Sequence, residues 1–136
     1  MAQYRTYSTL NKSTEDESEH ISVPQIRSAE HRSEVINTHQ VVVIDNYTDW
    51  CGPCKHCAPR FAKLAGKYTK PGVCALVKEN VEDGFDGHPE KIRGVPCFHF
   101  YANGQYISES TVVGADTDAV EQNLTQLLGI DSSRRY

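Results

Sequence analysis

Two cysteines, Cys51 and Cys54, lie where the apolar run 41–44 gives way to a helical pattern. A C-x-x-C pair at such a junction puts its first thiol at a helix N-terminus, where free N–H groups and the helix dipole stabilise a thiolate. Pro53 favours the first helical turn, and Gly52 leaves room for an incoming sulfur atom. The pair therefore predicts thiol–disulfide exchange, with Cys51 as the nucleophile and Cys54 as the resolving cysteine.

The spacing of the cysteines leaves two alternatives open. Cys51, Cys54 and Cys57 form C-x-x-C-x-x-C, and Cys97 could supply a fourth sulfur ligand to a metal. A redox-inactive adaptor could also use the fold for docking alone, although an intact cysteine pair argues against it. We favour the redox site and expect no bound metal. A Cys54–Cys57 bridge is not expected, because a regular helix would hold both residues in an unsuitable geometry.

Asp45 follows the apolar run directly, and so its carboxylate is expected to be buried. Burial raises the pKa of a carboxyl group by desolvation. The side chain could simply bond nearby backbone at the end of a strand. We favour a chemical role instead, in which Asp45 accepts the proton of Cys54 when that thiol attacks a mixed disulfide.

The composition excludes several classes of protein. The chain has 136 residues, of which 38% are hydrophobic and 24% charged, a size and balance typical of one globular domain. No apolar run approaches the ~20 residues of a membrane span, and the N-terminus lacks the apolar segment of a secretory signal. A net charge of -4 without a basic stripe argues against nucleic-acid binding. Five cysteines, an odd number, suit a reducing compartment, and we expect the cytoplasm.

Hydrophobic periodicity and turn residues outline the elements that position the cysteine pair. Residues 1–19 are polar and are expected to form a mobile tail. The predicted strands cover residues 20–24, 40–47, 73–81 and 97–101, with a turn at 102–104 and a return strand at 105–113. The predicted helices cover residues 28–38, 51–68 and 88–92, and a last one begins at Asp116 or Asp118 and ends at Gly129. Pro59 is expected to bend the second helix, whose buried stripe is predicted as Ala58, Phe61, Leu64, Ala65 and Tyr68.

The string Trp50-Cys51-Gly52-Pro53-Cys54 resembles the active-site motif of the thioredoxin family, and the resemblance extends over residues 20–128. It implies an α/β thioredoxin fold, with a central mixed β-sheet flanked by helices on both faces. It also implies reduction of disulfide-containing protein substrates without a bound cofactor. The electrons would come from NADPH through a separate thioredoxin reductase. We expect a monomer whose domain covers residues 20–129, followed by a short tail at 130–136.

The resemblance also assigns roles around the cysteine pair. Pro96 should follow a cis peptide bond, and Val95 should offer its backbone to a substrate strand. Trp50 and Gly114 should complete a flat docking rim with these two residues. Lys55 would support the thiolate, and the family carries an aspartate at the position of Asp45.

The chain departs from the family pattern at two places near the site. Asn46-Tyr47 stands where the family usually has Phe-Trp, and Cys97 replaces the threonine that usually follows the cis proline. Both changes alter the surroundings of the cysteine pair and leave its catalytic groups in place. Cys57, Cys74 and Cys97 are expected to be buried, unreactive thiols, and His56 is expected on the surface.

Overall fold

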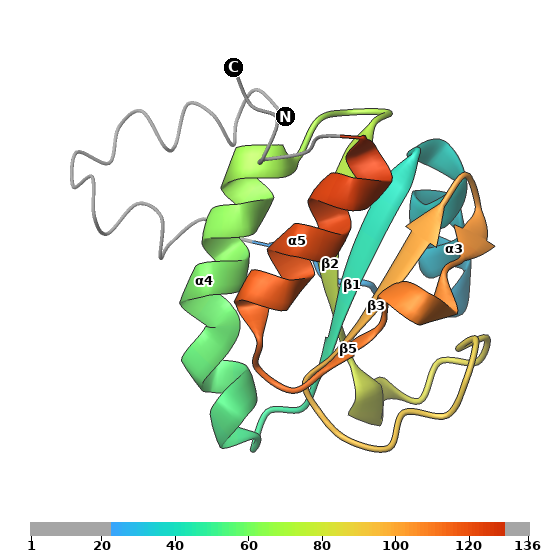
Figure 1. Ribbon diagram of the computed structural model, residues 1–136. Helices are drawn as coiled ribbons and strands as arrows, with labels where there is room; N and C mark the ends of the chain where they lie inside the picture. The colour runs from blue at the N-terminus through green and yellow to red at the C-terminus, as the bar shows by residue number, and fades with distance from the viewer. Residues whose placement is uncertain (1–22, 130–136) are drawn as a thin grey trace, which may run out of the picture.

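The computed structural model describes residues 23–129, in which five strands form one mixed sheet (Figure 1). The central strand β1 runs parallel to β2 and antiparallel to β3. Two short strands, β4 and β5, pair with β3 in antiparallel orientation. The strands are β1 (Val41–Tyr47), β2 (Cys74–Asn80), β3 (Cys97–Ala102), β4 (Gln105–Tyr106) and β5 (Val112–Val113).

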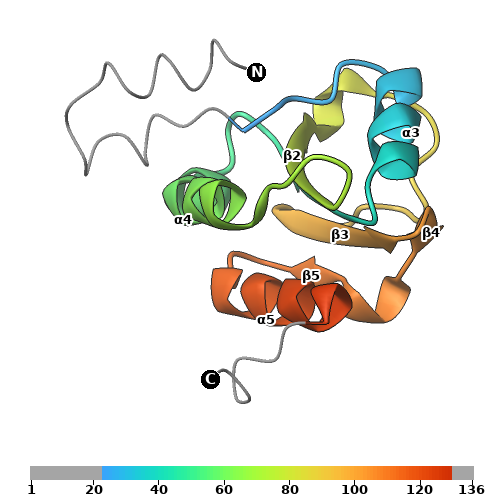
Figure 2. The same ribbon diagram turned by 90° about the horizontal axis from the view of Figure 1, so that it is seen from above.

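Helices cover both faces of this sheet (Figure 2). Helix α3 (Ala29–Thr38) packs on one face, whereas α4 (Gly52–Tyr68) and α5 (Thr117–Leu128) pack on the other. The α/β fold expected from the sequence, a mixed sheet with helices on both sides, is therefore confirmed. The N-terminus of α4 lies at the end of the sheet where β1 and β2 finish, and this places the cysteine pair at that edge.

The continuous apolar run of β1 is explained by burial on both faces. Successive side chains of a strand point to opposite faces. Val41 and Val43 enter the larger core beneath α4 and α5, while Val42 and Ile44 enter the smaller core beneath α3. All four residues are at most 4% exposed, as expected for a strand covered from both sides.

Helix α3 matches the predicted range. The Ser28 side chain caps it by accepting a hydrogen bond from the N–H of His31 at 2.9 Å. The strand predicted at residues 20–24 is wrong for residues 23 and 24, which are not in a strand. Its first three residues lie outside the described part of the chain. Only a single bridge forms, between Gln25 and Lys78, one residue beyond the predicted range. Pro24 has no N–H with which to extend a ladder.

Helix α4 also matches its prediction and runs continuously through Pro59. Phe61, Leu64 and Ala65 are buried and Tyr68 is half-buried, whereas Ala58 is exposed, so that its place in the buried stripe was wrong. Helical spacing identifies a face of the helix, but it does not show whether a neighbouring element covers each turn of that face.

Two predicted elements between β2 and α5 are wrong. Residues 88–92 form no helix, because Pro89 disfavours a helical conformation at His88 and the segment before it is held by side-chain bonds from Arg32. The single return strand at 105–113 is divided into β4 and β5 by a 3-10 turn at Ser108–Ser110. The tight turn before it is confirmed, with Asn103 and Gly104 both at positive φ.

Helix α5 begins at the first of the two predicted positions. The Asp116 carboxylate caps it by accepting a hydrogen bond from the N–H of Ala119 at 3.0 Å, and Gly129 ends it at φ 79°. None of the helices within residues 23–129 is long and apolar enough to cross a membrane. The predicted tails at 1–19 and 130–136 lie outside the described residues.

Candidate active site

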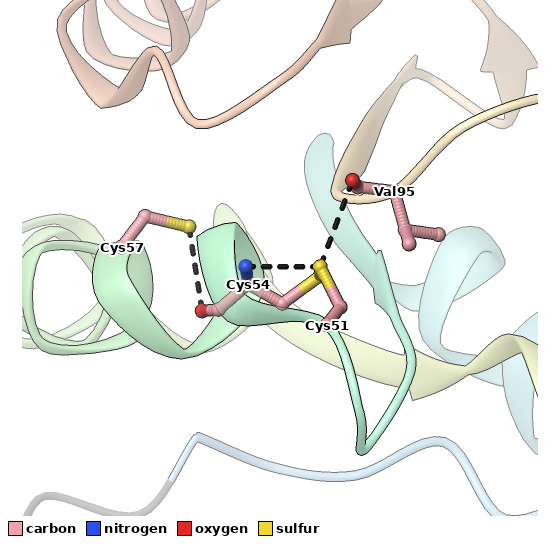
Figure 3. The surroundings of a disulfide bond; sticks show 4 residues. All are labelled: Cys51, Cys54, Cys57 and Val95. Atoms are coloured by element: carbon pink, nitrogen blue, oxygen red, sulfur yellow. Dashed lines mark hydrogen bonds between the residues drawn. A yellow bond between two sulfur atoms is a disulfide. The ribbon is translucent and has the colours of Figure 1, made fainter.

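Cys51 and Cys54 form a disulfide at the start of α4 (Figure 3). Their Cα atoms are 5.2 Å apart, and both residues are buried, at 4% and 5% exposed. Cys51 is the N-cap of the helix, and its sulfur accepts a hydrogen bond from the N–H of Cys54 at 3.1 Å. A donor and a helix N-terminus aimed at one sulfur stabilise negative charge there, as a nucleophilic thiolate requires.

The two residues between the cysteines fit their predicted positions. Pro53 lies in the first turn of α4, where its missing N–H costs nothing. A Cβ added to Gly52 would meet no atom within 4 Å, so the space beside the disulfide is open. Lys55 is exposed in the same turn, and its backbone N–H bonds the Cys51 carbonyl at 3.2 Å.

Val95 and Pro96, which precede β3, belong to a segment that lies beside the disulfide. The Val95–Pro96 peptide bond is cis, as expected. Figure 3 shows the Val95 carbonyl directed at the Cys51 sulfur, with the two atoms 3.6 Å apart. A backbone carbonyl and a reactive sulfur are thus presented side by side, in an arrangement that an extended chain could pair with.

Asp45 is buried in β1, at 5% exposed, and its Oδ1 atom has no hydrogen-bond partner. Desolvation raises its pKa to about 7, although the positive charge of Lys78 works against this shift. Its cross-strand neighbour Phe98 belongs to the core beneath α4 and α5, so Asp45 faces the helix that carries the cysteines. A carboxyl group that titrates near neutral pH can exchange protons with a thiol.

Large apolar side chains are exposed at two places in the described chain, Trp50 at 68% and Val113 at 67%. Gly114 follows Val113 at φ 105°, and its N–H donates to the Pro96 carbonyl at 2.8 Å, which joins β5 to the cis-proline segment. Three of the residues predicted to dock substrate, Val95, Pro96 and Gly114, are therefore brought together. Val113 was missed by the sequence reasoning, although an apolar residue on a short edge strand before that glycine is a usable signal.

Trp50 makes one directed contact. Its indole N–H donates to the carboxylate of Glu82 at 2.7 Å, and Glu82 lies in the 3-10 turn after β2. This partner was also missed, because it lies 32 residues away and no local pattern marks it.

The other three thiols, Cys57, Cys74 and Cys97, are free and buried. Burial raises the pKa of each to about 11. The Cys57 thiol lies 3.6 Å from the Cys54 carbonyl, so it can donate there rather than bridge to Cys54. Among residues 23–129 no group of three or more His, Cys, Asp or Glu side chains is arranged to hold a metal ion.

Comparisons with known proteins agree with this geometry. A family model described as thioredoxin matches residues 22–126. A thioredoxin of Neurospora crassa is 35% identical over 102 residues, which cover 72% of this chain and 80% of the relative. The oxidised thioredoxin of Plasmodium falciparum superimposes with a TM-score of 0.66 at 29% identity, covering 77% of this chain and 97% of that one.

A further structural match comes from work on the thiol-resolving mechanism of a yeast mitochondrial 1-Cys peroxiredoxin through the glutathione and thioredoxin systems. It has a TM-score of 0.64 at 27% identity and covers 77% of this chain and 95% of that one. The matched range includes the cysteine pair, the cis proline and the strands between them. The chain therefore belongs to the thioredoxin family and is a thiol–disulfide oxidoreductase that reduces protein disulfides.

Proposed function

We propose that Cys51 is the nucleophile and Cys54 the resolving cysteine of this reaction. The Cys51 thiolate attacks one sulfur of a substrate disulfide, forming a mixed disulfide and releasing the other substrate sulfur as a thiolate. The Cys54 thiolate then attacks the Cys51 sulfur, which releases the second substrate thiolate and leaves the Cys51–Cys54 disulfide. Two electrons pass to the substrate. The observation that carries this order is the hydrogen bond from the Cys54 N–H to the Cys51 sulfur, which favours the thiolate at Cys51.

Asp45 is the proposed proton acceptor for Cys54. Its pKa near 7 and its unpaired oxygen support this role, because a base is most useful when it titrates close to the working pH. Lys55 is assigned a minor part, since an exposed ammonium group stabilises a nearby thiolate only weakly.

Substrates are proposed to dock in extended form against the backbone of Val95, with Trp50, Pro96 and Gly114 around it. The exposed indole of Trp50 and the exposed side chain of Val113 offer apolar area to such a partner. The open space beside Gly52 admits the substrate sulfur.

The site holds its electrons in the cysteine pair, and so the reaction needs no bound cofactor. We assign the resupply of electrons to NADPH through a separate thioredoxin reductase. Disulfide forms of proteins, including peroxiredoxins like that of the yeast match, are the proposed substrates. We further propose a cytoplasmic monomer whose domain covers residues 20–129. Three free thiols support a reducing compartment.

The deciding experiment is insulin reduction with dithiothreitol or with NADPH and a thioredoxin reductase. Wild-type protein should be active, Cys51→Ser inactive, and Cys54→Ser should accumulate a mixed disulfide that mass spectrometry locates at Cys51. Full activity of Cys51→Ser would reject the assigned order. Sedimentation, limited proteolysis and imaging of a tagged chain would test the monomer, the domain bounds and the compartment.

A further inference from the structure

A second buried polar cluster lies on the α3 face of the sheet, and the proposed chemistry does not use it. Glu79 of β2 and Asn46 of β1 are cross-strand neighbours and both are 0% exposed. Arg32 reaches this cluster from α3 and is itself 4% exposed. A buried charge is costly unless it is paired and hydrogen-bonded, so these residues need a specific arrangement.

Arg32 and Glu79 meet that need with a two-pronged ion pair. Arg32 Nε donates to Glu79 Oε1 at 2.9 Å, and Nη2 donates to Oε2 at 2.8 Å. Burial alone would raise the pKa of Glu79, but the hydrogen bonds from Arg32 and His88 outweigh it and hold that pKa below its usual range. Both partners are therefore charged. Apolar side chains of similar size often stabilise a fold as much as a buried ion pair does, so stability alone does not explain this pair. Its distinctive property is where the remaining N–H donors of Arg32 point.

The remaining donors point into the loop that follows β2. Arg32 Nη1 donates to the Asp86 carbonyl at 2.6 Å, and Nη2 lies 3.3 Å from the Phe85 carbonyl. A Cβ added to Gly87 would lie 2.9 Å from Nη1, and Gly87 has φ +99°. The loop thus closes so tightly around the guanidinium that a Cβ at position 87 would force Nη1 or the loop to shift.

This loop continues without helix or strand to the cis-proline segment. At its far end, Asn46 Nδ2 donates to the carbonyl of Cys97, the residue after Pro96, at 3.0 Å. Since an irregular segment has no ladder of its own, its position depends on such anchors. The guanidinium fixes one end, and the bonds to Pro96 and Cys97 fix the other.

We propose that Arg32, held by Glu79, is a positioning residue for substrate docking: its grip on Phe85–Gly87 sets the place of the loop that presents Val95 and Pro96. This inference rests on the proposed docking role of those two residues. Arg32 touches neither cysteine, so its loss should weaken docking of a protein partner and leave the reactivity of Cys51 unchanged.

The test compares four chains as folded, reduced proteins: the wild type, Arg32→Lys, Gly87→Ala and Gly84→Ala. Arg32→Lys keeps the charge and removes the forked donors. Gly87→Ala keeps both Arg32 and Glu79 and adds a Cβ that Nη1 and the loop must move apart to admit. Gly84→Ala is the matched control, because Gly84 has φ +69° in the same loop and an added Cβ there would meet no atom within 4 Å.

Single-turnover reduction of insulin is measured over a range of insulin concentrations. It gives two separate quantities, the insulin concentration at half-saturation and the limiting rate. In Arg32→Lys and Gly87→Ala the half-saturating concentration should rise by about 10-fold or more. The limiting rate and the rate of Cys51 alkylation by iodoacetamide should stay within about two-fold of wild type. Gly84→Ala should behave as wild type in all three measurements.

Three results would overturn the inference: unchanged half-saturation in the two test variants, an equal fall in Cys51 alkylation, or the same loss in Gly84→Ala. If Arg32→Lys does not fold, the two glycine variants decide alone. A wild-type protein that does not reduce insulin would overturn both the proposed function and this inference. If the wild type is active and the half-saturating insulin concentration of the test variants is unchanged, only this inference is overturned.

Discussion

Asp45→Asn tests the link between a buried carboxyl group and the redox chemistry. The substitution keeps the size of the side chain and removes its ionisation. In the folded protein the pKa of Asp45 is about 7, against 3.8 for an unperturbed aspartate. The folded state therefore holds the proton more tightly than the unfolded chain does.

The sign of the stability effect follows from that difference. Below about pH 3.8 the group is neutral in both states and costs nothing. Between about pH 3.8 and 7 the unfolded chain ionises first, so the free energy of unfolding falls by about 1.4 kcal/mol for each pH unit. Above pH 7 the full cost, ~4 kcal/mol, is present. Asp45→Asn should escape this cost, and its advantage over wild type should grow by ~4 kcal/mol from about pH 4 to about pH 8.5.

Denaturant unfolding of the oxidised proteins at those two pH values measures the advantage directly. Other titrating groups act equally on both chains and cancel in the difference. Asp83→Asn provides the control, because it makes the same substitution at an exposed aspartate. A difference between Asp45→Asn and wild type that does not change with pH would refute the buried, protonated carboxyl group.

The same variant reports on catalysis. If Asp45 accepts the proton of Cys54, Asp45→Asn should slow resolution of the mixed disulfide by roughly 10- to 100-fold and remove the inflection of that step near pH 7. Rapid-mixing measurements of substrate release from the mixed disulfide give the rate. If Asp45→Asn released substrate at the wild-type rate and with the wild-type pH profile, the proton-acceptor role would be rejected even if the stability result holds.

Three further predictions concern the surroundings of the pair. Brief iodoacetamide treatment of the reduced protein at neutral pH should label Cys51 first and leave the three buried thiols unlabelled until unfolding, as peptide mapping would show; equally fast labelling of one of them would contradict their raised pKa values. Trp50 fluorescence should change on reduction of the disulfide, and identical spectra of the oxidised and reduced protein would reject a contact between Trp50 and the pair. Glu82→Gln should alter the emission by weakening the hydrogen bond to the indole, and an unchanged spectrum would reject that hydrogen bond. Phe61→Ala removes a side chain that is 1% exposed and whose ring lies 5.5 Å from that of Phe98. It should lower the free energy of unfolding by about 3–5 kcal/mol in denaturant titration, and a loss under about 1 kcal/mol would contradict the burial of Phe61.

The sequence was most informative where one local signal dominates. The apolar run of β1 identified a doubly covered strand. Helix caps identified the start of α3 at Ser28 and narrowed the start of α5 to Asp116 or Asp118, of which the structure has the first. The cysteine spacing and the proline between the cysteines located the start of α4. Each of these signals acts within a few residues, and no distant contact is needed to interpret it.

The errors arose where distant contacts decide the conformation. The helix predicted at 88–92 does not form, and the backbone before it is bound by Arg32, whose partner Asp86 is 54 residues away. Nothing in the spacing of Arg32 and Glu79 reveals that they pair, since a charged residue on a short helix is usually solvated. The exposure of Val113 was also missed: its place before Gly114 was a local hint, but the exposure itself depends on how β5 pairs with β3.

The end of β1 explains how one short segment serves two surfaces. Asp45 and Asn46 are adjacent, and the alternation of a strand sends their side chains to opposite faces of the sheet. Asp45 faces the core beneath the helix that carries Cys51, whereas Asn46 lies beside Glu79 and bonds the carbonyl of Cys97. The polar Asn46, at the position where the family usually has Phe, therefore points away from the cysteine face and bonds the residue that follows Pro96. If Asp45 and Arg32 have the roles proposed above, proton transfer and placement of the partner can change independently, because the two residues lie on opposite faces of the sheet.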